Sequence, residues 1–234
     1  MRSRRIPVLL PPGCPPIFPD PNLADDEGLI AVGADLSRER LLAAYDQGIF
    51  PWPAEGLPLL WWSPNPRAIM DLEHLHVSRS MRRVLASKRF QVTFDQAFEQ
   101  VMIECGRERD EGTWITPAMV EAYVDLHRRG HAHSVEVWSD GELCGGLYGV
   151  QRGGLFAAES MFHRLTNASK VALITCIQGF FAAGITLFDV QFVTEHLASL
   201  GAYAIPRRDY LRRLGAARVS SVELLLLGSL REPR

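Results

Sequence analysis

Cysteine is scarce in this chain, and its four copies stand far apart. Cys14, Cys105, Cys144 and Cys176 form no CxxC pair, so we expect neither a disulfide-stapled scaffold nor a cysteine zinc framework. Long apolar runs are also missing, because no stretch approaches the ~20 residues that a membrane helix needs. These absences predict a cytoplasmic protein that has no membrane partner.

A strong net charge is missing as well. The 234 residues include 25 Lys and Arg against 27 Asp and Glu, a formal net charge of −2, and 47% are hydrophobic. Such values exclude a disordered chain and give no overall signal for nucleic acid. The basic start is followed only by the short apolar stretch 6–10 and then by two prolines, so a secretion signal is not expected.

Cofactor signatures are absent too. His127 and His131 stand four apart, but Gly130 ends the helix between them, and with His133 they lack a completing Cys or carboxylate. The glycines of residues 141–154 have neither the phosphate-loop nor the dinucleotide spacing; we expect them at turns and close strand contacts. These patterns therefore predict no metal site and no phosphate-loop or dinucleotide cofactor site.

What the sequence does contain is a mixed pattern of strands and helices, which indicates an α+β fold. Alternation and the Asp140-Gly141 turn signal predict an antiparallel meander. Its strands are expected at 134–138, 142–151 and 155–159, followed by an apolar helix over 167–183 and a strand over 186–192.

Two prolines at positions 64 and 66 predict a rigid turn. Near it we place the boundary between a small N-terminal α/β domain, residues 1–65, and a larger domain, residues 66–234. Further helices are expected at 37–47, with Ser37 as its cap, and from Asp95, as a cap, to Gly106.

The first candidate for chemistry is a carboxylate beside an amide on the strand over 186–192. Asp189 and Gln191 stand two apart, so in a regular strand they share one face, and Phe188, Val190 and Phe192 share the other. Such a pair can orient an incoming amine and accept its charge. The alternative is an amphipathic strand whose polar face meets solvent.

Glu159 ends the third meander strand among apolar neighbours. A carboxylate in that setting must be paired or must meet solvent at a cleft. A charge at an ordinary strand end is the competing interpretation.

A basic run extends over residues 79–89, with five cations and no acid. On a helix, Arg79, Arg82 and Arg83 share a face, and Lys88 follows them. A basic stripe of this kind can bind phosphates. The competing interpretation is a solvated helix face.

Tryptophan occurs in loops. Trp52 lies between two prolines, and Trp114 lies in the loop Thr113-Trp114-Ile115. A tryptophan on a loop can stack on a nucleic-acid base, whereas the plainer interpretation is that both fill the core.

Several long motifs in one order resemble the leucyl/phenylalanyl-tRNA–protein transferase family over about residues 22–214. They are Phe50-Pro51-Trp52, Trp61-Trp62-Ser63-Pro64-Asn65-Pro66-Arg67, Gly112-Thr113-Trp114-Ile115-Thr116, Gly130-His131-Ala132-His133-Ser134, Glu159-Ser160-Met161-Phe162, Asn167-Ala168-Ser169-Lys170, His196-Leu197-Ala198-Ser199-Leu200-Gly201-Ala202 and Ile205-Pro206-Arg207-Arg208-Asp209-Tyr210. The resemblance implies that the larger domain has a fold like that of the GNAT acetyltransferases. It also implies transfer of Leu, Phe and, less efficiently, Met from aminoacyl-tRNA to proteins that begin with Arg or Lys. The product is marked for degradation by the N-end rule, and we expect the enzyme to act as a monomer. Neither a metal nor a free nucleotide cofactor is implied by the resemblance, so no cofactor is expected.

The resemblance also implies residue roles. Trp52 and Trp114 would hold the terminal adenosine of the tRNA, and Glu159 would orient the aminoacyl end. Asp189 and Gln191 would act at the attacking amine. An apolar pocket for the Leu or Phe side chain would include Leu147, Phe156, Cys176 and Phe188, and the acceptor-stem phosphates would contact Arg79, Arg82, Arg83 and Lys88.

Two other functions compete with this one. An acyl-CoA-dependent acyltransferase of the same fold would need a pyrophosphate loop before a helix, and the turn at Arg152-Gly153-Gly154 is a poor one. A non-catalytic RNA-binding module would use the basic helix and the tryptophans alone.

Overall fold

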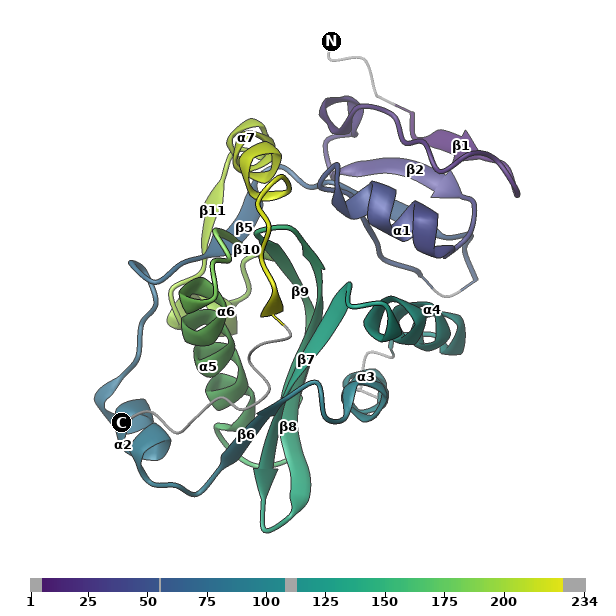
Figure 1. The fold of residues 1–234 in the computed structure, drawn as a ribbon. Coiled ribbons are helices and arrows are strands. Elements are labelled where there is room, and N and C mark those ends of the chain that lie inside the picture. Colours follow the sequence, from purple (N-terminus) through teal and green to yellow (C-terminus); the bar gives the residue numbers. More distant parts are fainter. Residues whose placement is uncertain (1–5, 55, 108–112, 225–234) are drawn as a thin grey trace.

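The protein is described by a computed structural model that covers residues 6–54, 56–107 and 113–224. Residues 1–5 and Gly112, named above in the basic start and in one motif, fall outside these ranges. Two sheets organise the chain (Figure 1). The four-stranded sheet has the order β1-β2-β4-β3, and the seven-stranded sheet has the order β11-β5-β10-β9-β8-β7-β6.

The four-stranded sheet consists of β1 (Val8–Leu10), β2 (Leu29–Gly33), β3 (Phe50–Pro51) and β4 (Leu60–Trp62). The seven-stranded sheet consists of β5 (Arg67–Met70), β6 (Gln91–Phe94), β7 (Ala132–Ser139), β8 (Glu142–Arg152), β9 (Leu155–His163), β10 (Leu187–Gln191) and β11 (Tyr203–Ile205). The α-helices are α1 (Arg38–Tyr45), α2 (Arg79–Ala86), α3 (Phe98–Gly106), α4 (Pro117–Arg128), α5 (Ala168–Ala182), α6 (Glu195–Ser199) and α7 (Arg207–Ala217). The predicted α+β class is confirmed by this mixture.

The predicted meander is confirmed as β7, β8 and β9, which pair antiparallel in sequence order. The turn between the first two strands is made by Asp140 and Gly141, both at positive φ (52° and 80°), as a tight hairpin requires. The strand after the apolar helix, β10, returns parallel to β9 and antiparallel to β5. The larger sheet is therefore mixed.

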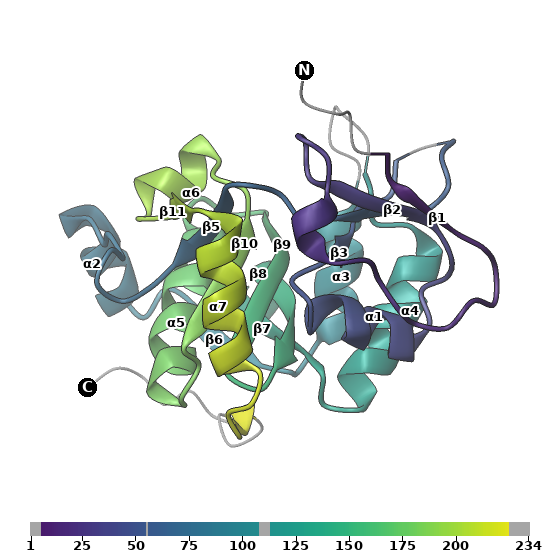
Figure 2. The same ribbon diagram turned by 90° about the horizontal axis from the view of Figure 1, so that it is seen from above.

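Helices cover both faces of the larger sheet (Figures 1 and 2). The apolar helix α5 packs on one face, and α3 and α4 pack on the other. Gly145 in β8 permits the approach of α5, because a Cβ there would lie 2.5 Å from the Cβ of Ala168. Close strand packing, one of the two roles that the sequence predicted for these glycines, is found at Gly149, where a Cβ would lie 2.3 Å from the Ala157 carbonyl oxygen of β9.

The two sheets share a continuous apolar core. Tyr45 and Trp61, from the first 65 residues, belong to the same buried cluster as Phe98 and Tyr123. The proposed domain boundary near residue 65 coincides with the change of sheet. Whether the two parts fold independently is not tested by this packing, so the division at residue 65 stays a proposal.

One expected helix cap is wrong. Helix α3 begins at Phe98 with Ala97 as its cap, and Asp95 instead adopts positive φ (56°). Its carboxylate accepts the Ser134 N–H at 2.8 Å and contacts His133 Nδ1 at 2.7 Å. Asp95 thus links the loop before α3 to strand β7.

In the part of the chain that the structure describes, no helix is long and apolar enough to cross a membrane.

Candidate active site

The site forms where two parallel strands separate. Strands β9 and β10 pair only from Leu155 with Leu187 to Ala157 with Asp189, although β9 continues to His163. Beyond that point the strands leave a cavity of about 310 Å³. It is lined by Phe50, Pro51, Trp52, Trp114, Leu147, Ala158, Glu159, Ser160, Met161, Val190, Gln191, Phe192, Thr194, His196 and Leu197.

A break in strand register lies on each side of the cavity. The pairing of β8 with β9 skips Glu159, and the pairing of β10 with β5 skips Val190. Bulges of this kind re-aim side chains and are common beside functional sites. Gln191 follows its bulge at φ 57°, a conformation uncommon for a residue other than glycine.

The expected alternation along β10 is therefore wrong at its end. Val190, Gln191 and Phe192 all line the cavity, whereas Asp189 does not. Asp189 is completely buried behind the cavity wall, so the alternative of a solvent-facing polar strand is also wrong. The bulge and the positive φ of Gln191 break the two-residue period on which both expectations relied.

Four hydrogen bonds satisfy the buried Asp189 carboxylate. Arg67 donates from Nε to Oδ1 at 2.8 Å and from Nη2 to Oδ2 at 2.6 Å. The Gln191 backbone N–H donates to Oδ1 at 3.0 Å, and the Tyr210 hydroxyl donates to Oδ2 at 2.9 Å. The carboxylate thus fixes the backbone of the residue that faces the cavity.

Arg67 is itself held between two rings. Its guanidinium carbon lies 4.8 Å from the centre of the Phe50 ring and 4.5 Å from that of Tyr210. Its Nη1 donates to the Gly48 carbonyl at 3.0 Å. Since Gly48 and Phe50 belong to the first 65 residues, this cation ties that part of the chain to β10.

Glu159 lies half-buried in the cavity wall. Its carboxylate contacts the Tyr45 hydroxyl, which lies 2.6 Å from the Tyr123 hydroxyl. Burial raises the pKa of Glu159 to about 8, with a further contribution from the Asp189 charge, against the opposing effects of Tyr45 and Arg67. Glu159 Oε1 lies 3.5 Å from Gln191 Nε2, at the outer limit of a hydrogen bond.

The two predicted tryptophans meet at the cavity. Their ring centres lie 6.5 Å apart with an interplanar angle of 64°, and Phe192 packs 5.2 Å from Trp52. Trp52 is 40% exposed, so part of an aromatic face remains open at the cavity edge. The plainer interpretation was that both tryptophans fill the core, and the exposure of Trp52 does not fit it.

The expected side-chain pocket is only partly in the cavity wall. Leu147 lines the cavity, whereas Phe156, Cys176 and Phe188 lie behind it in the same apolar cluster as Leu147. The rings of Phe156 and Phe188 lie 5.4 Å apart. Their role in amino-acid recognition stays a prediction.

The basic run forms α2 as expected, with Arg79, Arg82 and Arg83 exposed and Met81 buried. Lys88 is exposed just beyond the helix. Figure 2 places α2 on the opposite side of the molecule from the four-stranded sheet. None of these four cations lines the cavity.

Sequence reasoning missed several residues of the site: Ser160, Met161 and His196 in the cavity wall, and Arg67 buried behind it. Arg67 and His196 stand inside motifs that carried the family resemblance, and this was the available signal, but neither received a role. Ser160 and Met161 reach the cavity because the bulge at Glu159 shifts β9. Among the described residues, no group of three His, Cys, Asp or Glu side chains is placed to hold a metal ion.

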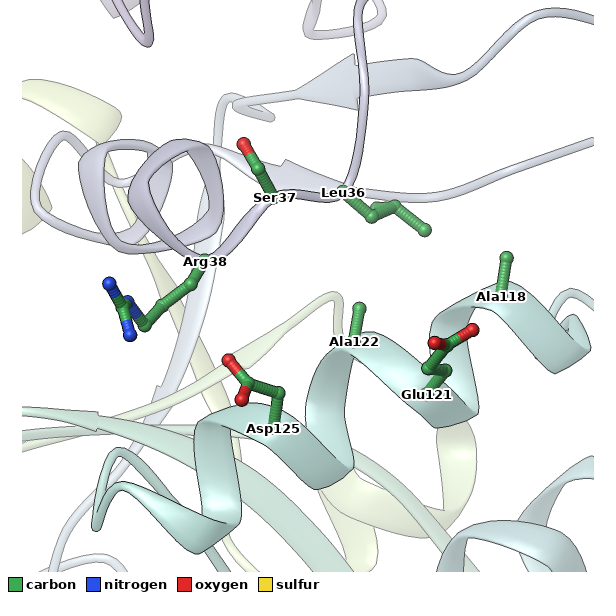
Figure 3. A pocket seen from close by; sticks show the side chains of 7 residues that line it. All are labelled: Leu36, Ser37, Arg38, Ala118, Glu121, Ala122 and Asp125. Carbon is green, nitrogen blue, oxygen red and sulfur yellow. The ribbon is translucent and has the colours of Figure 1, made fainter.

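A second depression lies between the start of α1 and helix α4 (Figure 3). Leu36, Ser37 and Arg38 line it from one side, and Ala118, Glu121, Ala122 and Asp125 of α4 line it from the other. Its lining contains no tryptophan and none of the residues to which the sequence analysis gave a role in chemistry or binding.

Comparison with known proteins identifies the family. Residues 69–215 match the family model described as leucyl/phenylalanyl-tRNA protein transferase, and residues 34–65 match the model of its N-terminal domain. Leucyl/phenylalanyl-tRNA–protein transferases of Shigella sonnei (strain Ss046) and Escherichia coli (strain K12 / DH10B) are each 53% identical over 204 residues. These alignments cover 86% of this chain and 87% of each relative.

Solved structures give a more distant likeness. A GCN5-related N-acetyltransferase from Kribbella flavida is 10% identical with a TM-score of 0.38, over 69% of this chain and 58% of that chain. L-PGS from Bacillus licheniformis is 18% identical with a TM-score of 0.37, over 72% of this chain and 57% of that chain. Likeness at this level says nothing about the site. On the sequence matches, the chain belongs to the leucyl/phenylalanyl-tRNA–protein transferase family and is an aminoacyltransferase.

Proposed function

We propose that this enzyme transfers Leu, Phe and, less efficiently, Met from aminoacyl-tRNA to the N-terminal Arg or Lys of a protein. The observation that carries the proposal is the meeting of an aromatic platform, Trp52 and Trp114, with Glu159 and Gln191 in one cavity. The platform suits the terminal adenosine, and the polar pair suits the reacting groups. The enzyme would act as a cytoplasmic monomer, and its products would enter N-end-rule degradation.

The reaction exchanges an ester for an amide. The acceptor's α-amine attacks the carbonyl carbon of the aminoacyl ester, the C–N bond forms, and the bond to the ribose oxygen breaks. One amine proton ends on the departing ribose oxygen, so atoms balance without a cofactor. Since a free α-amine has a pKa of about 7.7–8.0, a substantial fraction must lose a proton before it can attack.

Gln191 is the group proposed to hold that amine. Its side-chain carbonyl can accept a hydrogen bond from the N–H that points away from the attacking lone pair. Holding amine and ester in line supplies much of the rate acceleration. The fixed backbone of Gln191, which donates to Asp189 at 3.0 Å, supports this positioning.

Asp189 is proposed to act electrostatically. Its carboxylate already accepts four hydrogen bonds and lies outside the cavity, so direct proton transfer from the amine is the less favoured role. A buried negative charge near the amine stabilises the positive charge that develops during attack. Asp189 is thus a positioning residue in this proposal.

Substrate selection has two parts. The Leu or Phe side chain would enter the apolar region where Leu147 leads to Phe156, Cys176 and Phe188. The cationic acceptor side chain needs a carboxylate, and Glu159 is the acidic residue in the cavity wall. Its raised pKa would fall when that cation arrives, because a nearby positive charge favours the charged carboxylate.

Away from the cavity, the exposed stripe on α2 would contact acceptor-stem phosphates. Its members are Arg79, Arg82, Arg83 and Lys88.

The test is transfer of labelled leucine from Leu-tRNA to a peptide that begins with Arg, with an otherwise identical peptide that begins with Ala as control. Wild-type enzyme is measured beside Asp189→Ala. Transfer to the Arg peptide alone, lost in the variant while tRNA binding persists, is expected. Folded wild-type enzyme that binds tRNA yet transfers no Leu, Phe or Met would instead indicate an RNA-binding module.

A further inference from the structure

The proposed reaction needs a proton acceptor that Asp189 and Gln191 do not supply. The attacking α-amine loses a proton as the C–N bond forms, and the departing ribose oxygen gains one. Asp189 lies outside the cavity and already accepts four hydrogen bonds. Gln191 can accept a hydrogen bond, but its neutral amide does not titrate near neutral pH. A side chain that takes the proton must therefore be another group in the cavity wall.

Among the described residues that line the cavity, Glu159 and His196 have side chains that titrate near neutral pH or below. Burial raises the pKa of Glu159 to about 8, so its carboxyl is mostly protonated at neutral pH. When the Arg or Lys side chain of the peptide is present, that cation stabilises the carboxylate and makes it a weak base. Glu159 is therefore poorly suited to take the proton in either state, which leaves His196.

His196 faces the cavity from the first turn of α6. Thr194 and Leu197 of the same turn also line the cavity, and the Thr194 hydroxyl fixes the turn by accepting the Leu197 N–H at 3.2 Å. Strand β10 leads directly into this turn. Gln191 and His196 therefore belong to one continuous segment of the cavity wall and stand five positions apart.

The His196 ring is free to meet a substrate. In the part of the chain that the structure describes, no hydrogen bond, ion pair or ring contact engages it, and the side chain is exposed. Other polar groups of the wall are already engaged, because Glu159 contacts the Tyr45 hydroxyl and the Thr194 hydroxyl caps α6. A neutral imidazole has one donor and one acceptor nitrogen, so both remain available at the cavity.

The surroundings of His196 favour the neutral ring. Partial burial lowers its pKa, and the positive charges of Lys170 on α5 and His163 on β9 lower it further. The neighbouring acid on α6, Glu195, is exposed to solvent. A neutral imidazole has the free lone pair that a general base needs.

We propose that His196 is the general base and general acid of the transfer step. Its unprotonated ring nitrogen takes a proton from the α-amine as the C–N bond forms. The resulting imidazolium gives that proton to the ribose oxygen as the C–O bond breaks, so the ring ends neutral and atoms and charge balance. This inference rests on the proposed function and adds a catalytic residue to it, while Gln191 and Asp189 keep their positioning roles.

Single-turnover transfer of leucine from Leu-tRNA to an Arg peptide tests the proposal. Wild-type enzyme is compared with His196→Gln, whose amide keeps a polar side chain but cannot take up a proton. His76→Gln is the matched control, because His76 is an exposed histidine that does not line the cavity.

The rate of peptide-bond formation in His196→Gln is expected to fall by about 10²–10⁴-fold, which is the usual contribution of a general acid–base residue. The Kd for Leu-tRNA should stay near the wild-type value, and His76→Gln should behave as wild type. A wild-type rate in His196→Gln, or weaker tRNA binding with an unchanged rate, would overturn the assignment.

Chemical rescue separates proton transfer from mere positioning. In His196→Ala, added imidazole is expected to restore transfer in proportion to the concentration of its unprotonated form, because free imidazole can enter the open cavity and accept the proton. Wild-type enzyme and His76→Gln should gain nothing from it. A lost rate that imidazole does not restore would contradict the role of His196 in proton transfer.

The wild-type result keeps this inference apart from the proposed function. Normal transfer by wild-type enzyme, together with an unimpaired His196→Gln, would refute the role of His196 and leave aminoacyl transfer intact. Folded wild-type enzyme that transfers no Leu, Phe or Met would refute the proposed function, and the role of His196 with it.

Discussion

Arg67 and Asp189 form a completely buried, bidentate ion pair, with N–O distances of 2.8 and 2.6 Å. The two residues are 122 positions apart in the sequence. The Asp189 carboxylate in turn holds the backbone of Gln191 at the cavity. The ion pair therefore fixes the backbone of Gln191, the residue proposed to hold the attacking amine.

Removing the cation of this pair should strongly destabilise the fold. Arg67→Ala leaves Asp189 buried without its counter-charge, and breaking a buried pair in this way costs about 3–5 kcal/mol. Urea denaturation followed by tryptophan fluorescence measures the change. Arg67→Lys keeps the charge but loses the bidentate geometry. Its free energy of unfolding should therefore lie between those of wild type and Arg67→Ala. Wild-type stability in Arg67→Ala would contradict this account of the pair.

Glu159 should make stability depend on pH. Its pKa rises from 4.5 to about 8 in the folded protein, so between these values the folded chain binds more protons than the unfolded chain. Linkage then requires the free energy of unfolding to fall as pH rises through this window. Glu159→Gln should show a smaller fall, measured by urea denaturation at several pH values from 5 to 8. Parallel curves for the two proteins would refute the raised pKa.

The fold followed from local signals. Alternating strands and the Asp140-Gly141 turn predicted the meander, because a tight hairpin requires residues that tolerate positive φ. The same logic misplaced Asp95 as a helix cap, since its carboxylate instead accepts the Ser134 N–H on a strand far along the chain. Local patterns report neighbours in sequence and say little about such distant partners.

The site was predicted less completely for a physical reason. The sequence pointed to Asp189 and Gln191 as a pair, but strict alternation along the strand predicted that their side chains share one face of the sheet. The bulge at Val190 and the positive φ of Gln191 break that period. The burial of Asp189 depends on Arg67, which no periodicity along β10 could reveal.

The tryptophan platform should act on donor binding. Trp52→Ala and Trp114→Ala remove a stacking surface worth about 1–3 kcal/mol per base, or roughly 5- to 150-fold in affinity. The expected result is a raised KM for Leu-tRNA, with a smaller effect on kcat. Trp52→Phe keeps a ring and should recover part of the loss. A change in kcat alone, with KM unaltered, would contradict the proposed role of the two tryptophans in donor binding.

The arginines of α2 should contribute salt-dependent affinity for tRNA. Arg82→Gln and Arg83→Gln each remove one exposed cation. If each contacts a phosphate, the slope of log affinity against log salt concentration should become shallower by nearly one unit per substitution. Filter binding of tRNA across a salt series measures the slope. Arg212→Gln on α7 is the control, and a slope equal to wild type in the α2 variants would refute the contact.

The most direct test of the mechanism is the kcat of Gln191→Ala for leucine transfer from Leu-tRNA to an Arg peptide. Since Gln191 is proposed to hold the attacking amine, kcat should fall by about 10²–10³-fold, in the range of one positioned catalytic group. The Kd for Leu-tRNA should remain near the wild-type value. A wild-type kcat in folded Gln191→Ala would contradict the central claim that the chemistry occurs where β9 and β10 separate.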